Sequence, residues 1–143
     1  GFKTHAKMML ILRREEQTLK RYVHMGTGNY HAGNARLYTD YSILTSDLAL
    51  TEDVHKLFNQ LIGMGKTQRM KKLLQAPFTL KKRMLELINR ETLNALAGKP
   101  AHIIAKANSL TDAKIIKALY KASQSGVKVD LIIRPAFPAC RTT

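Results

Sequence analysis

Residues 102–133 read HIIAKANSLTDAKIIKALYKASQSGVKVDLII, and this stretch decides the fold that we expect for the chain. Apolar runs at residues 102–107 and 127–133 predict two buried strands, and apolar side chains recur at helical spacing between them. The predicted helix covers residues 112–124, with Thr111 as its N-cap. A strand, a helix and a second strand joined by short links form a βαβ crossover. The sequence therefore predicts an α/β fold with two parallel strands that are covered on both faces.

The amino-terminal part of the chain also predicts strands followed by a helix. Residues 3–13 alternate between two faces, and residues 18–24 follow a polar turn, so the two segments predict a β-hairpin. Residues 35–45 have the composition of a third strand. Apolar side chains then recur at helical spacing over residues 50–62, with Thr51 as the predicted N-cap because acidic residues follow it.

A boundary between two domains is predicted near the dipeptide Ala76-Pro77. A basic stretch precedes it, and a further amphipathic helix is predicted after it, at residues 80–97. We therefore divide the chain into a first domain, residues 1–75, and a second domain, residues 76–143.

The composition indicates a folded, strongly basic protein that meets a polyanion. The chain has 143 residues, of which 45% are hydrophobic, and a formal net charge of +14. This hydrophobic content argues against a disordered polycation, and the charge favours nucleic acid, an anionic membrane surface or a phosphate polymer as partner. The one cysteine, Cys140, excludes an intrachain disulfide and fits a reducing compartment. No apolar run approaches the roughly 18–20 residues that a membrane-spanning helix needs.

His5 and Lys7 are the candidate catalytic residues. They lie two positions apart in the predicted strand, so their side chains share one face. Neutral imidazole is a good nucleophile toward phosphorus, and its attack would leave a phosphohistidine. A neighbouring ammonium group could neutralise the phosphoryl oxygens as charge develops on them. A histidine with a purely structural role in the sheet is the alternative.

Two further segments could bind phosphate. Residues 26–29 read GTGN, and such small residues let backbone N–H groups turn inward to form an anion-binding concavity. Arg36 and Tyr38 lie an even number of positions apart, so we expect them on one face of the predicted third strand. A guanidinium group suits phosphate oxygens, and a tyrosine hydroxyl can add a hydrogen bond. A surface arginine beside a core tyrosine is the alternative.

The histidines do not predict a metal site, because they are scattered along the sequence and only Cys140 could add a thiolate ligand. The five are His5, His24, His31, His55 and His102.

Read together, five stretches between residues 3 and 134 resemble bacterial polyphosphate kinases, the type that makes inorganic polyphosphate from ATP. They are THAKMMLILRRE, RYVHMGTGNYH, ARLYTDYSILT, QAPFTL and SGVKVDLIIR. The resemblance implies a phospholipase-D-like α/β fold. It implies that the chain holds the end of one catalytic domain and the start of a second, which contains the βαβ unit, so that the chain is a piece of a longer enzyme.

The resemblance also implies roles for individual residues. His5 matches the histidine that becomes phosphorylated, and Lys7 matches the lysine of the same His–x–Lys signature. Tyr38 matches a tyrosine that contacts the nucleotide phosphates, and Arg134 matches an arginine of the same phosphate site. The implied activity is reversible transfer of the ATP γ-phosphate to polyphosphate, with ATP, ADP and polyphosphate as ligands and Mg²⁺ as cofactor. Earlier arginines that help to hold magnesium would lie outside this sequence.

The implied setting is a cytoplasmic homo-oligomer, associated with the inner face of the plasma membrane. Because half of the implied site lies outside these 143 residues, we expect the isolated chain to be a poor enzyme.

The sequence departs from the family pattern at two places. Residues 31–34 replace a stretch that usually carries a lysine and a threonine. The resemblance ends just after Arg134, where Pro135 stands in place of the usual glycine.

Two other functions stay open at this point. One is a basic nucleic-acid-binding module without enzymatic activity, which the low aromatic content of 6% makes less favourable because it offers few stacking platforms. The other is half of a phospholipase-D-like phosphodiesterase. Leu12 argues against it, because the phospholipase D pattern has an aspartate at this position.

Overall fold

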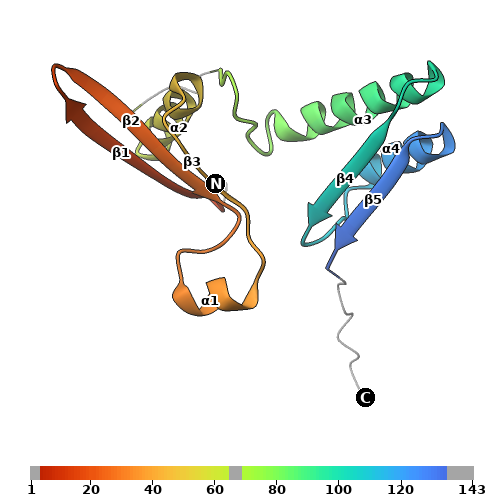
Figure 1. The fold of residues 1–143 in the computed structure, drawn as a ribbon, viewed down its shortest axis with the longest axis horizontal. Helices are drawn as coiled ribbons and strands as arrows, with labels where there is room; N and C mark the ends of the chain where they lie inside the picture. The colour runs from red at the N-terminus through yellow and green to blue at the C-terminus, as the bar shows by residue number, and fades with distance from the viewer. Residues whose placement is uncertain (1–3, 65–68, 135–143) are drawn as a thin grey trace. The chain divides into compact units, whose positions relative to one another are not determined.

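The computed structural model describes residues 4–64 and 69–134. The chain divides into two compact units, Gly1–Leu73 and Leu74–Thr143 (Figure 1). Each unit combines strands with helices, so the expected mixture of α and β structure is confirmed.

The first unit contains a three-stranded antiparallel sheet in the order β1-β2-β3. These strands are β1 (Lys7–Glu15), β2 (Thr18–Gly26) and β3 (Ser42–Thr45). The predicted hairpin is confirmed, because β1 pairs with β2 from Lys7 opposite Gly26 to Glu15 opposite Thr18. Glu16 enters the left-handed region, with φ of 54°, as a tight hairpin turn requires.

Helix α2 (Leu48–Leu61) covers one face of this sheet (Figure 1). Val23 of β2 and Val54 of α2 are fully buried and form the centre of the unit. The predicted N-cap at Thr51 is wrong. Asp47 caps the helix instead, because its carboxylate accepts a hydrogen bond from the Leu50 amide at 2.8 Å. Thr51 lies one turn further along and is fully buried.

The predicted third strand over residues 35–45 is wrong in its first half. Residues Ala32–Leu37 form a short helix, α1, and only Ser42–Thr45 pair with β2. The helix begins at His31, whose ring Nδ1 accepts a hydrogen bond from the Asn34 amide at 3.2 Å. The α1 segment contains no β-branched residue, but Gly33 and Asn34 are poor helix formers, so the His31 cap matters for this short helix.

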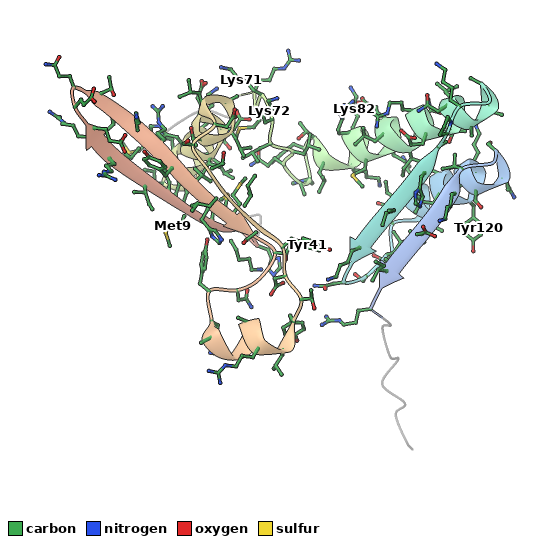
Figure 2. The ribbon with its side chains drawn as sticks, in the orientation of Figure 1. Met9, Tyr41, Lys71, Lys72, Lys82 and Tyr120 are labelled. Atoms are coloured by element: carbon green, nitrogen blue, oxygen red, sulfur yellow. The ribbon has the colours of Figure 1, made fainter. Side chains whose placement is uncertain are left out.

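A buried carboxylate ties the end of the first unit to α2. Asp53 has no exposed surface, and its oxygens accept hydrogen bonds from the backbone amides of Lys71, Lys72 and Leu73 at 2.9, 2.6 and 3.0 Å. Figure 2 shows Lys71 and Lys72 beside the helix. Burial opposes ionisation of Asp53, but the three N–H groups together hold its pKa below the usual range.

The second unit contains the predicted βαβ crossover. Its elements are α3 (Leu80–Leu96), β4 (His102–Ala107), α4 (Ala113–Gln124) and β5 (Lys128–Ile133). Strands β4 and β5 pair in parallel from His102 opposite Lys128 to Ala107 opposite Ile133, which confirms the expected strand direction. Gly126 has φ of 93° and turns the chain from α4 into β5.

The N-cap of α4 is Asp112 and not the predicted Thr111. One Asp112 oxygen accepts hydrogen bonds from the amides of Lys114 and Ile115 at 3.0 and 3.1 Å. The other oxygen forms an ion pair with Lys81 of α3 at 2.5 Å.

One face of the β4-β5 sheet packs against the two helices, and the other face is open. Ile103 and Val129 pack against a core formed by Ile88, Leu119, Ala122 and Val127. On the opposite face, Ile104 and Ile132 are 67% and 57% exposed. The expectation that both faces are covered is therefore not met within residues 69–134.

Candidate functional site

The open face of the first sheet carries the candidate catalytic residues. Residues that are directly opposite in an antiparallel pair lie on the same face, and faces alternate along each strand. Val23 points at α2, so the next residue, His24, lies on the other face together with Met9 and Lys7 of β1. Figure 2 shows the Met9 side chain leaving the sheet on the side away from α2.

Strand β1 begins at Lys7, later than the predicted residue 3, and His5 lies two residues before it. The two side chains are nevertheless brought together at this end of the strand. The distance between His5 Nε2 and Lys7 Nζ is 3.0 Å. The His5 ring is exposed and Lys7 is half-buried. His5 is therefore accessible to a ligand from solvent and is not packed in a core.

A second imidazole, that of His24, shares the face and was not predicted as a site residue. His24 lies opposite Met9 and diagonally across from Lys7. Its Nδ1 forms a hydrogen bond with the Tyr30 hydroxyl at 2.8 Å, and the two ring centroids are 5.5 Å apart. The signal that could have identified it is the hairpin register, because a two-residue turn after Glu15 fixes which residues of β2 share a face with His5.

The loop between β2 and β3 is closed at its base by a network around Thr27. Its hydroxyl donates to Asp40 Oδ1 at 3.0 Å and accepts from the Tyr41 amide at 3.0 Å. The Thr27 amide donates to the Tyr41 carbonyl oxygen at 2.9 Å. These bonds hold together the two ends of the segment that carries α1, and with it Arg36 and Tyr38.

Gly28 has a structural reason to be glycine. A Cβ atom at this position would lie 2.3 Å from Asp40 Oδ2, so another residue fits only if the Asp40 side chain or the loop shifts. The carboxylate of Asp40 also brings negative charge to the segment 26–29, which we had predicted to bind an anion. The close approach of Asp40 therefore explains the glycine at position 28, and phosphate binding is not needed to explain it.

Arg36 and Tyr38 do not share a strand face, because α1 replaces that part of the predicted strand. Arg36 lies in the last turn of α1 and is exposed. Tyr38 is the C-cap residue, with extended backbone and a side chain that is 53% exposed. Both side chains are accessible to a ligand. They are positioned by α1 and its C-cap, and not by the predicted strand.

Arg134 lies in the second unit, directly after β5. Its amide donates to the Ala107 carbonyl oxygen at 3.4 Å, which continues the pairing of β4 and β5 by one residue. Its side chain is exposed at the carboxyl end of the two parallel strands. In open α/β sheets this end is where ligands bind.

Among residues 4–64 and 69–134, no group of three or more His, Cys, Asp or Glu side chains could hold a metal ion. We assign no step of the reaction to Mg²⁺. Cys140 and Pro135 lie outside the described residues. In the described part of the chain, no helix has the length and apolar character needed to cross a bilayer.

Comparison with known proteins defines the class to which this fold and this histidine site belong. Residues 1–68 match the family model for polyphosphate kinase C-terminal domain 1, and residues 73–141 match the model for polyphosphate kinase C-terminal domain 2. The two matches cover nearly the whole chain and meet where the structure divides into its two units. The chain belongs to the polyphosphate kinase family.

Individual relatives agree with this assignment. A polyphosphate kinase of Pseudomonas putida is 81% identical over 134 residues, which are 94% of this chain and 18% of the relative. A polyphosphate kinase of Neisseria meningitidis serogroup A is 55% identical over 134 residues, which are 20% of that protein. The crystal structure of polyphosphate kinase from Porphyromonas gingivalis superposes with a TM-score of 0.84 at 34% identity, covering 99% of this chain and 23% of that one. The chain thus spans about a fifth of the length of the curated relatives.

Proposed function

We propose that this chain supplies the phosphorylated histidine of a kinase that reversibly transfers the γ-phosphate of ATP to inorganic polyphosphate. The observation that carries the proposal is the exposed His5 ring with Lys7 Nζ at 3.0 Å from Nε2, in a chain of this family. We also propose that the two units are the end of one phospholipase-D-like catalytic domain and the start of a second, divided near residue 75.

The transfer takes place in two displacements at phosphorus. In the first, a lone pair on the His5 ring attacks the γ-phosphorus of ATP, a P–N bond forms, and the bond to the bridging oxygen breaks so that ADP leaves. In the second, a terminal oxygen of polyphosphate attacks the same phosphorus, and the P–N bond breaks. The imidazole recovers its lone pair, and the chain is longer by one phosphate. The same steps in reverse make ATP from polyphosphate.

Lys7 has a defined part in the first displacement. Its ammonium nitrogen lies 3.0 Å from the ring Nε2, so it must turn away before that nitrogen can attack. A phosphoryl oxygen is the natural new partner, because an ammonium–phosphate contact is stronger than one to a neutral ring. Lys7 thereby positions the γ-phosphate beside His5 and neutralises charge that develops during transfer.

Tyr38, Arg36 and Arg134 are proposed to bind the remaining phosphate oxygens. The guanidinium groups offer paired donors, and the tyrosine hydroxyl offers one more. The proposed setting is the cytoplasm, in a homo-oligomer at the inner face of the plasma membrane.

The test is phosphate labelling of a full-length chimera, in which this sequence replaces the matching segment of the Pseudomonas putida kinase. With γ-labelled ATP, the protein should acquire an acid-labile, base-stable label that added polyphosphate removes. The His5→Ala variant should acquire no label and make no polyphosphate.

His102→Ala is the matched control, since His102 is also an exposed histidine at the start of a strand. It should keep the label. Polyphosphate synthesis by a folded His5→Ala variant would refute the proposed role of His5.

A further inference from the structure

The carboxyl ends of β4 and β5 bring three hydrogen-bond donors to one edge of the second sheet. The arrowheads of the two strands lie side by side in Figure 1 and point the same way. Lys106 lies opposite Ile132 near this edge, Asn108 follows β4 directly, and Arg134 follows β5. The hydrogen bond from the Arg134 amide to Ala107 keeps the two chain segments paired up to this point.

Lys106 lies on the open face of the sheet, and Asn108 follows directly after β4, which ends at Ala107. Ile103 packs against the core and Ile104 does not, so side chains at positions 104 and 106 lie on the open face. The same reasoning places position 134 with Ile132, which is 57% exposed. Lys106, Asn108 and Arg134 are all exposed.

The two ends of this face differ in charge. At the amino end, Asp130 lies between two basic residues, with His102 Nε2 at 2.6 Å and Lys128 Nζ at 3.6 Å from its Oδ2. At the carboxyl end, residues 103–111 and 131–134 include no acidic residue. The next acid along the chain, Asp112, caps α4 and pairs with Lys81.

We propose that Lys106 and Asn108 join Arg134 to form a binding site for one phosphate group of a phosphoanhydride chain. An ammonium, an amide NH₂ and a guanidinium group are all donors, and a phosphate group offers only acceptors. Their position at the carboxyl edge of parallel strands is where this class of sheet binds its ligands. The inference rests on the proposed function, since that function makes ATP and polyphosphate the two sources of such a phosphate.

The test uses Lys106→Met and Asn108→Asp in the full-length chimera. Lys128→Met is the matched control. It removes the same charge from the same face of the sheet, but at the amino ends of the two strands. We expect each edge variant to weaken ligand binding about tenfold or more, as the loss of one hydrogen bond to a charged group does. Lys106→Arg should restore most of the affinity, whereas the control should change it less than about twofold.

Two ligands distinguish the sources of the phosphate. Binding of ATP and of inorganic tripolyphosphate is measured in the His5→Ala background, where no transfer takes place, and KM and kcat for each substrate are measured in the active chimera. A loss confined to ATP assigns the site to the nucleotide, and a loss confined to tripolyphosphate assigns it to the polymer. A raised KM with a similar kcat indicates binding, and unchanged thermal unfolding shows that the fold is intact.

Failure of this inference differs from failure of the proposed function. Equal affinities for the edge variants and the control, in a chimera that makes polyphosphate, overturn the phosphate site and leave the function in place. If the edge variants lose affinity but no phosphohistidine ever forms, the site stands and the proposed function falls.

Discussion

Gly28 and Asp40 lie so close together that the carboxylate of one occupies the space where the other would carry a side chain. A Cβ atom on residue 28 would lie 2.3 Å from Asp40 Oδ2 and 2.6 Å from its Cγ. The same Asp40 accepts the hydrogen bond from Thr27 that closes the base of the loop. The position of α1, and hence of Arg36 and Tyr38, depends on this contact.

Gly28→Ala is therefore expected to displace the loop. Forcing a methyl group into a closely packed contact costs about 1–3 kcal/mol, part of which the loop avoids by moving. The free energy of unfolding from denaturant titration of the chain should fall, and KM for ATP in the chimera should rise. Gly26→Ala is the control, since a Cβ there would meet the Tyr41 carbonyl oxygen at 3.4 Å, an ordinary van der Waals contact. Equal effects of the two substitutions would contradict the proposed importance of the contact.

The stability of the first unit should depend on acid pH through Glu52 and Asp53. Hydrogen bonds from Lys71 and Lys56 lower the pKa of Glu52 from 4.5 to about 2. A carboxylate whose pKa is lower in the folded chain stabilises the fold above its ordinary value, and this stabilisation is lost as the pH falls through the folded pKa. The free energy of unfolding should therefore decrease from pH 4.5 to about 2.

Two variants separate the contributions to this acid sensitivity. Glu52→Gln should flatten the curve, and its effect should diminish in high salt because Glu52 is exposed to solvent. Asp53→Asn should destabilise the unit at neutral pH as well, since an amide NH₂ replaces one oxygen that accepts backbone hydrogen bonds. An acid profile that is identical in both variants and the parent would show that other groups control the transition.

Tyr30→Phe should slow phosphorylation of His5 without unfolding the protein. We propose that His24, on the face that also carries Lys7, donates a hydrogen bond to the phosphoryl group that His5 receives. The change removes the Tyr30 hydroxyl that holds His24 Nδ1 at 2.8 Å. We expect a loss of about tenfold or less in the rate of label incorporation, because one neutral hydrogen bond is removed. Tyr120→Phe alters an exposed tyrosine of α4 in the second unit and should leave the rate unchanged. If both variants react at the parent rate, His24 is not oriented by Tyr30 for catalysis.

The isolated 143-residue chain should be a poor kinase. It spans about a fifth of the length of its relatives, and phosphoryl transfer loses about a hundredfold or more in rate when its groups are not held in place. Turnover of the chain is compared with that of the chimera at equal concentration. Equal rates would show that the groups of this chain are sufficient for the reaction.

The βαβ unit was predictable because its signals are local. The predicted bounds of β4 agree with the structure, since its mainly apolar segment is followed by a polar loop. Both predicted N-caps, Thr51 and Thr111, are wrong for the same reason. In each case an aspartate that precedes or follows the threonine caps the helix instead. At Asp47 and Asp112 the carboxylate accepts from the first amides of the helix and also interacts with its dipole.

The site was predictable in part. His5 and Lys7 meet because they are only two positions apart in the chain, although β1 begins at Lys7 and does not include His5. Helix α1 depends on a single histidine cap and on the Thr27 network with residues more than ten positions away, so no periodic pattern shows it. His24 could be placed only once the register of the hairpin was known.

The open faces of the two sheets have a colloidal consequence. The exposed side chains of Ile104 and Ile132 favour association between copies of the chain. The formal net charge of +14 opposes this association, because the copies repel one another. A long polyanion that cancels this repulsion should make the isolated chain turbid near the point of charge balance, and excess polyanion should clear the solution again.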